Sequence, residues 1–318
     1  MRLGDVLGRP YSPNLGDTEG ALGSYRKAQA LMERALALRP GESANQDELL
    51  QSYMKISRIL ERQKKIAEEM EILQRAIRIA EALRKHDPKE LIYTEELALV
   101  TQYLGQVQYQ MAEKEKSVTG FQQALETYQK ALAIQQSVGP QASESWRRGL
   151  ATRYQYIGYA LFALGEWTGD ASHYKKALDA VFKGSEISRN LAESHTRQPD
   201  ATITRVLADE LQLIGLLRWK CCRDLTGSLR DLHESLQTFE MLSAADPQNL
   251  EGRRDIADVH NRIGEVLTEA GRSREAMGAN LRALIRYEEL ARVDPSSMEN
   301  ASYIAKVRSR IVELQGHK

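Results

Sequence analysis

The chain has 318 residues, of which 42% are hydrophobic and only 6% are aromatic, and its 44 basic residues balance its 44 acidic residues. Because no basic surplus exists to neutralise phosphates, nucleic-acid binding has no global electrostatic support. No run approaches the roughly 18 apolar residues of a membrane-spanning helix, and the first residues lack the apolar core of a signal peptide. We therefore expect a cytoplasmic location and no membrane insertion by this chain.

Apolar residues recur at helical spacing along the chain, which predicts an all-α protein. The expected helices, in chain order, are 18–38, then the pairs 46–62 with 66–84, 91–112 with 120–136, 143–164 with 171–194, 201–222 with 227–244 and 250–269 with 273–292, and a last helix at 298–315. A tight turn is expected at 270–272 and an enlarged turn at 166–170. The last helix carries Lys306, Arg308 and Arg310 among its apolar residues, as expected of an end that faces water.

Two landmarks repeat in phase through these pairs. Prolines that end the second helices recur at intervals of about 50 residues, at Pro40, Pro88, Pro140, Pro199, Pro247 and Pro295. A small residue recurs inside the first helices, at Gly4, Ser57, Gly105, Gly158, Gly215 and Gly264. Glycine inside a helix costs about 1 kcal/mol relative to alanine, so its repetition indicates a close approach of the second helix. The pattern predicts a solenoid of stacked helical hairpins.

Small residues on the second helix complete the pattern, for example Ala276 and Ala283 after Ile263–Gly264. This arrangement resembles the tetratricopeptide repeat, which implies a right-handed superhelix of helical hairpins. Two features differ from that family: the unit is about 48 residues long instead of about 34, and the aromatic before the apolar–glycine pair is present only at Tyr53 and Tyr154. The long unit resembles repeats attached to some bacterial, especially acidobacterial, serine/threonine kinases.

We expect one solenoid over residues 1–318. Its parts are an incomplete first unit at 1–40, repeats at 41–88, 89–140, 141–199, 200–247 and 248–295, and a capping helix at 296–318. Because Leu3–Gly4 aligns with Ile263–Gly264 in the middle of a first helix, we expect the chain to be part of a longer polypeptide. A catalytic domain such as a kinase could precede it.

The sequence shows no motif for catalysis, for a cofactor or for a metal. It contains no phosphate-binding glycine loop, no HExxH, no zinc-spaced cluster and no nucleophile elbow. His260 takes the place of a core aromatic and is expected to serve packing. Cys221 and Cys222 are adjacent, so we expect two reduced thiols rather than a bridge. These features predict no catalytic residue, no cofactor and no metal ligand.

The candidate site lies on the first helices, which line the concave groove in arrays that resemble the tetratricopeptide repeat. Equivalent positions hold carboxamides at Gln102, Gln155, Gln212 and Asn261, aromatics at Tyr109, Phe162 and Trp219, and acids at Asp209 and Asp258. Carboxamides can pair with an extended peptide backbone, and aromatics are common anchors at interfaces. The alternative is structural: the amides bridge neighbouring helices and the aromatics fill space between units.

The leading hypothesis is a non-catalytic scaffold that binds a protein or an extended peptide in its groove, for sensing or recruitment in a larger signalling protein. The alternative is a module for intramolecular regulation of an attached enzyme, or for self-association. An enzyme in its own right is the least favoured hypothesis.

Overall fold

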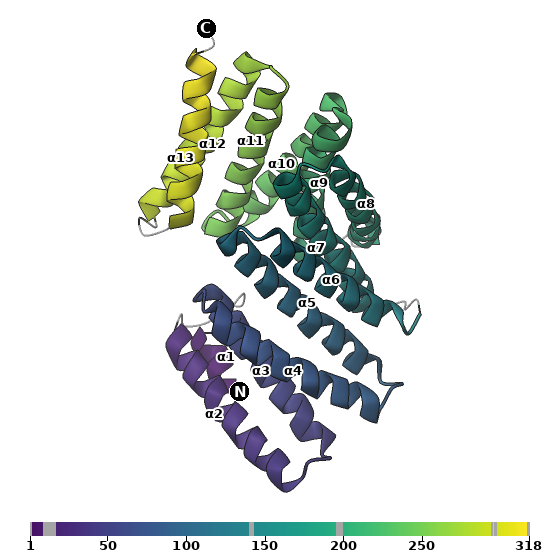
Figure 1. The fold of residues 1–318 in the computed structure, drawn as a ribbon. Helices are drawn as coiled ribbons and strands as arrows, with labels where there is room; N and C mark the ends of the chain where they lie inside the picture. The colour runs from purple at the N-terminus through teal and green to yellow at the C-terminus, as the bar shows by residue number, and fades with distance from the viewer. Residues whose placement is uncertain are drawn as a thin grey trace. The chain divides into compact units, whose positions relative to one another are not determined.

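The structure is a computed structural model that describes residues 2–8, 17–139, 143–194, 200–293, 295 and 298–316. All regular elements in these ranges are α-helices (Figure 1), and none of them is long and apolar enough to cross a membrane. The predicted all-α fold of helical hairpins is confirmed. The chain divides into two compact units, Met1–Thr168 and Gly169–Lys318.

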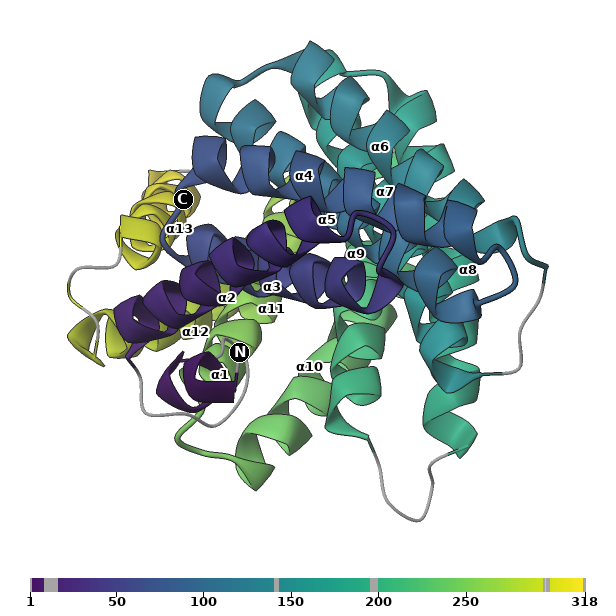
Figure 2. The same ribbon diagram turned by 90° about the horizontal axis from the view of Figure 1, so that it is seen from below.

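The first unit is built from seven successive helices over the described residues. They are α1 (Arg2–Gly8), α2 (Thr18–Leu38), α3 (Ser43–Arg62), α4 (Ile66–His86), α5 (Leu91–Glu115), α6 (Val118–Gln136) and α7 (Glu144–Thr168). Each helix packs against the next one, and α5 also packs against α7. The views in Figures 1 and 2 show α3, α4 and α5 side by side. The buried faces of α2, α3, α4 and α5 form one apolar core that includes Tyr25, Tyr53 and Leu73.

The second unit is built in the same way. Its described helices are α8 (Ala171–Ser194), α9 (Ala201–Cys222), α10 (Leu225–Ala245), α11 (Leu250–Glu269), α12 (Ser273–Val293) and α13 (Met298–Gly316). Each helix packs against the next one from α8 to α11, α11 packs against α12 and α9, and α13 packs against α12 and α11. Val307 and Ile311 of α13 are buried in a core with Tyr287 of α12.

The recurring glycines give space to large side chains of the second helix. A Cβ atom on Gly4 would lie 2.5 Å from the Tyr25 ring, and one on Gly105 would lie 2.6 Å from the Tyr128 ring. At Gly215 the second helix itself is close, since the same Cβ would lie 2.9 Å from the carbonyl oxygen of Ser228. The predicted close approach is therefore present, and aromatic side chains fill part of it in the first unit.

One repeat uses a polar pair at this place. Ser57 stands where other units have glycine, and its hydroxyl donates a hydrogen bond of 3.0 Å to Oε1 of Glu69 on α4. Glu69 is 3% exposed, and burial raises the pKa of its carboxyl to about 7. In this repeat serine replaces the glycine of α3 and glutamate replaces a small residue of α4, and the hydrogen bond between them joins α3 to α4.

The turns inside the hairpins share a left-handed residue. Gly271 in the predicted tight turn has φ 73°, and the corresponding turns have Lys64, Lys116 and Arg223 with φ of 55°, 53° and 54°. A left-handed conformation is unfavourable for residues with a side chain. The hairpin geometry therefore imposes this conformation even where the sequence does not supply glycine.

Two predictions about local structure are wrong. The enlarged turn at 166–170 is shorter, because α7 continues to Thr168 while Trp167 stacks on Phe121 with ring centroids 6.3 Å apart. Cys221 and Cys222 form a disulfide and are not free thiols. The two cysteines are consecutive residues at the end of α9, with Cα atoms 3.8 Å apart.

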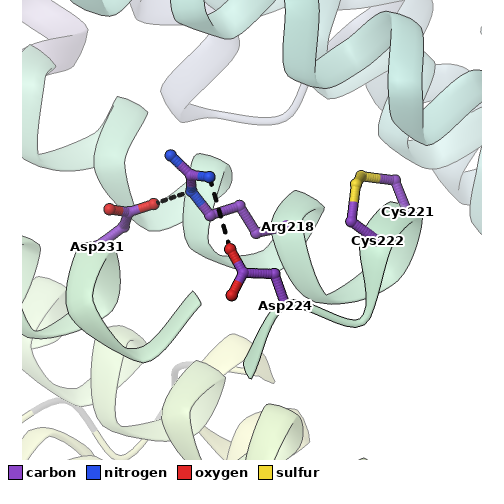
Figure 3. Close-up of a disulfide and its surroundings, with 5 residues drawn as sticks. All are labelled: Arg218, Cys221, Cys222, Asp224 and Asp231. Carbon is purple, nitrogen blue, oxygen red and sulfur yellow. Dashed lines mark hydrogen bonds and ion pairs between the residues drawn. A yellow bond between two sulfur atoms is a disulfide. The ribbon is translucent and has the colours of Figure 1, made fainter. Parts of the chain in front are cut away.

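Ion pairs join α9 to α10 near this disulfide (Figure 3). Arg218 of α9 donates from Nε to Asp231 of α10, and its Nη1 lies 3.6 Å from Asp224. Asp224 also caps α10, because its side chain accepts a hydrogen bond from the backbone N–H of Gly227.

Four of the predicted helix ends agree with the structure at proline. The helices α2, α4, α10 and α12 end before Pro40, Pro88, Pro247 and Pro295. Pro140, Pro199 and Asp294 lie outside the described residues.

Candidate protein-interaction surface

The first helices of the hairpins in the first unit, α3, α5 and α7, line two hollows. One has a volume of about 190 Å³ and is lined by Glu61, Gln106, Tyr109, Gln110, Tyr128, Tyr156 and Tyr159. We call it the tyrosine pocket. The other has a volume of about 320 Å³ and is lined by Gln51, Met54, Ile92, Glu95, Glu96, Leu99, Gln135, Ser145, Gly149 and Arg153. We call it the arginine pocket. The second helices contribute one residue to each, Tyr128 and Gln135 of α6.

The tyrosine pocket has a buried floor and half-buried walls. Tyr128 is almost fully buried, where Gly105 leaves room for its ring. Tyr156 stacks on Tyr128 with centroids 5.3 Å apart, and Tyr159 follows at 6.3 Å from Tyr156. Tyr109 meets Phe121 edge-on at 5.2 Å. The rings are therefore held by packing on one another, which limits the conformational entropy that a ligand would have to remove.

Glu61 carries the charge at this pocket. Its Oε2 lies 2.9 Å from Nη1 of Arg58 on the same helix, and the Arg58 guanidinium lies over the ring of Tyr103, 5.0 Å from its centroid. Burial, with smaller contributions from Tyr156, Tyr109 and Glu113, raises the pKa of Tyr128 well above its ordinary value. Tyr128 therefore remains neutral at physiological pH.

The arginine pocket contains a buried cation. Arg153 of α7 is 3% exposed, and its Nη1 donates a hydrogen bond of 2.7 Å to the carbonyl oxygen of Gly149. Burial lowers the pKa of Arg153 to about 10, while Glu95 opposes the shift, so the guanidinium stays charged. Burial and the nearby Asp47 raise the pKa of Glu96 to about 7.

The structure places four predicted site residues on α5 and α7. Tyr109 lines the tyrosine pocket, and Phe162 is half-buried. Gln102 and Gln155 are buried, and Gln102 is only 3% exposed. Its Oε1 accepts no hydrogen bond from the described residues. A buried acceptor without a partner costs about 1–3 kcal/mol, and Gln102 lines neither the tyrosine pocket nor the arginine pocket.

In the second unit several predicted residues have partners within the chain. Asn261 of α11 accepts a 3.0 Å hydrogen bond from Arg310 of α13, which also donates to Asn280. Asp258 accepts from the hydroxyl of Tyr287. Gln212 of α9 is half-buried. Arg310 was predicted to face water, but its side chain turns inward instead. There its guanidinium donates hydrogen bonds to the side-chain oxygens of Asn261 and Asn280.

Trp219 of α9 is also held inside the second unit. It is 8% exposed, and its indole N–H donates a 2.8 Å hydrogen bond to Glu269. The Arg223 guanidinium lies 4.9 Å from the centre of its ring. These contacts are those expected of an aromatic that joins α9 to α11.

Acidic side chains of α9 and α11 surround Arg205. Its guanidinium lies 2.7 Å from Asp255 and 3.0 Å from Glu251. Burial and Asp255 raise the pKa of the predicted site residue Asp209 to about 7, and burial raises that of Asp255 to about 7 as well. His260 is buried, and burial lowers the pKa of its imidazole to about 4, as suits a packed neutral ring.

Sequence reasoning did not select Tyr156, Tyr159 and Arg153. Tyr159 and Arg153 have no residue of the same type at the equivalent positions of other units, and Tyr156 is matched only by Tyr103, so a search for residue types repeated through the units passes over them. The available signal was the density of tyrosine in α7, at Tyr154, Tyr156 and Tyr159. Only the packing of α6 against α7 brings Tyr128 to them.

The comparison with protein families finds a match in the first part of the chain. Residues 14–42 and 50–83 match the tetratricopeptide repeat. These matches support the predicted resemblance to the tetratricopeptide repeat family. No curated protein matches the sequence.

Two solved structures are similar to this chain over nearly its whole length. BtubC (BKLC) from P. vanneervenii is 15% identical, with 88% of this chain and 93% of that chain covered and a TM-score of 0.52. The apo form of RapI is 15% identical, with 93% of both chains covered and a TM-score of 0.53. At this identity the likeness concerns the fold.

Proposed function

We propose that the chain is a non-catalytic scaffold that binds an extended segment of a partner protein along the first helices of its hairpins. The observation that carries the proposal is the lining of the tyrosine and arginine pockets, to which α3, α5 and α7 all contribute. Concave surfaces built by successive repeats are the usual binding surfaces of repeat proteins, and the family match agrees with this use.

Two buried amides of the first helices, Gln102 and Gln155, are of a type that suits a peptide backbone. Gln102 has a buried acceptor without a partner among the described residues, and Gln155 lies on the next first helix. Amides donate and accept, so they can pair with main-chain groups of any sequence. In the second unit, Gln212 and Asn261 with Trp219, Asp209 and Asp258 remain proposed contributors.

The proposed setting is a larger signalling protein. The resemblance of the long repeat unit to repeats attached to bacterial serine/threonine kinases supports this setting. In that setting the scaffold would recruit or sense a partner for the attached domain.

Self-association is the second candidate. Leu281 and Ile285 of α12 stand four residues apart on one helix face and are 43% and 56% exposed, and Val312 of α13 is 65% exposed. Apolar side chains on an outer helix face favour contact with another apolar surface.

The substitution Gln102→Leu tests the scaffold. A leucine of similar size removes the amide without leaving a buried polar atom, so the free energy of unfolding should be unchanged or higher. Affinity for a peptide selected from a random decapeptide library should fall about 2- to 10-fold, the equivalent of one hydrogen bond.

The matched control is Gln123→Leu on α6, where the glutamine is exposed on a second helix. It should leave the affinity unchanged. Equal affinities of wild type and Gln102→Leu, or capture of no peptide by the wild-type chain, would remove the support for this surface.

A further inference from the structure

The tyrosine pocket differs from an ordinary gap between helices in its lining. Four tyrosines, two glutamines and one carboxylate form it, and neither lysine nor arginine is among the described residues that line it. Tyr128 and Tyr156 stack in a nearly parallel arrangement, 24° between ring planes, and Tyr159 and Tyr109 flank them. Aromatic faces carry negative partial charge, and they attract a cation that lies over them.

The size of the pocket sets the size of the ligand. Sites for drug-sized molecules usually occupy about 300–1,000 Å³, whereas this one has about 190 Å³. That volume suits one amino-acid side chain and excludes a whole cofactor. The lining comes mainly from α3, α5 and α7, along which the partner segment is proposed to lie.

The charge of the surroundings selects a cation. Glu61 contributes a carboxyl group to the wall, and Glu113 adds a smaller contribution to the raised pKa of Tyr128. Arg58 lies next to the wall, where it pairs with Glu61 and covers the ring of Tyr103. The same combination of a guanidinium, a tyrosine face and a carboxylate therefore already exists at the rim.

We infer that the tyrosine pocket receives one arginine side chain of the partner segment, with the guanidinium on the tyrosine faces and beside the carboxylate of Glu61. Arginine suits this geometry because its planar guanidinium stacks on aromatic rings and pairs with carboxylates. The inference rests on the proposed scaffold function. It adds that the scaffold prefers a partner segment that contains an arginine.

The test measures binding of a small probe to the full chain. N-acetyl-arginine methylamide is titrated against the protein and followed by NMR, and its citrulline counterpart serves as a neutral ligand of the same shape. The arginine probe should bind at least 5-fold more tightly than the citrulline probe. Equal binding of the two would overturn the inference.

Variants assign the binding to the pocket. Glu61→Gln and Tyr159→Leu should each weaken the arginine probe about 3- to 30-fold, the range of a charge-assisted or a cation–π contact, and Tyr159→Phe should restore most of the loss because it keeps the ring. Tyr154→Leu is the matched control, since Tyr154 lies on the same helix outside the lining and accepts a hydrogen bond from Gln136. Undiminished binding by Tyr159→Leu, or an equal loss in Tyr154→Leu, would overturn the assignment.

The outcome also separates this inference from the proposed function. Library peptides that bind equally well when their arginine is replaced by citrulline would refute the arginine site and leave the scaffold intact. Binding of the arginine probe without capture of any library peptide would support the site and refute the scaffold.

Discussion

Buried acids are the residues that determine how the stability of this protein responds to pH. Glu69 is the clearest case, because it has 3% exposure and a pKa of about 7 instead of its ordinary 4.5. Its folded-state pKa is raised, so the folded protein binds the proton more tightly than the unfolded chain. The stabilisation from this proton is complete below the ordinary pKa and is lost as the pH rises through about 7.

Glu69→Gln should therefore flatten the pH dependence of stability. Between pH 5 and pH 8 the wild type should lose on the order of 2–3 kcal/mol more than the variant in the free energy of unfolding. Chemical denaturation at both pH values measures the difference. Glu68→Gln, at the exposed neighbour that pairs with Arg26, should behave like wild type. An equal pH dependence in Glu69→Gln and wild type would mean that Glu69 is ionised in the folded protein.

The left-handed residues give a second prediction at this scale. Lys116 has φ 53° after the end of α5, where a side chain is disfavoured by roughly 1 kcal/mol relative to glycine. Lys116→Gly should raise the free energy of unfolding by about 0.5–1 kcal/mol. Lys114→Gly, inside the last turn of α5, should lower it by a similar amount. Destabilisation by both substitutions would argue against the left-handed turn.

Helices and their pairing were the part of the structure that the sequence predicted best. Periodic apolar residues and the glycine and proline landmarks placed the helices α2, α8, α9 and α11 at the bounds that the structure gives. The turns inside the hairpins were harder to predict. Gly169 and Gly271 indicate a left-handed conformation in two of them, whereas Lys64, Lys116 and Arg223 adopt it under the constraint of the hairpin. The disulfide was missed because adjacent cysteines are seldom bridged.

The site could be predicted only in part, for a related physical reason. A row of equivalent positions identifies helix faces, and Tyr109 was found in this way. A pocket instead depends on which side chains of different helices meet, as Tyr128 of α6 and Tyr156 of α7 do. Likewise, no repeat pattern shows that Arg310 of α13 turns towards Asn261 and Asn280.

The last helix supplies a prediction at the scale of the element. Val307 of α13 is fully buried against α12, whereas Val312 on the same helix is 65% exposed. Val307→Ala should lower the free energy of unfolding by about 2 kcal/mol, because two buried methyl groups are lost and a cavity remains. Val312→Ala should change it by less than about 0.5 kcal/mol. Equal effects would show that α13 is not packed as a cap on the second unit.

At the scale of the whole molecule, each unit is stabilised by contacts between helices that are neighbours in the chain. Contacts of this kind join segments that are close in the sequence. In stacked helical hairpins they leave one face of the first helices uncovered by another element. In the first unit that face holds two hollows with charged and aromatic walls. We propose that this face of α3, α5 and α7 binds an extended segment of a partner protein.

Photo-crosslinking tests that claim most directly. A decapeptide selected from a random library, carrying benzoylphenylalanine at successive positions, is bound to the full chain, irradiated and mapped by mass spectrometry. The account predicts crosslinks on α3, α5 and α7 around the two pockets, for example at Met54, Gln106 and Tyr159, in an order that follows the peptide sequence. Crosslinks confined to the exposed faces of α4 and α6 would contradict it.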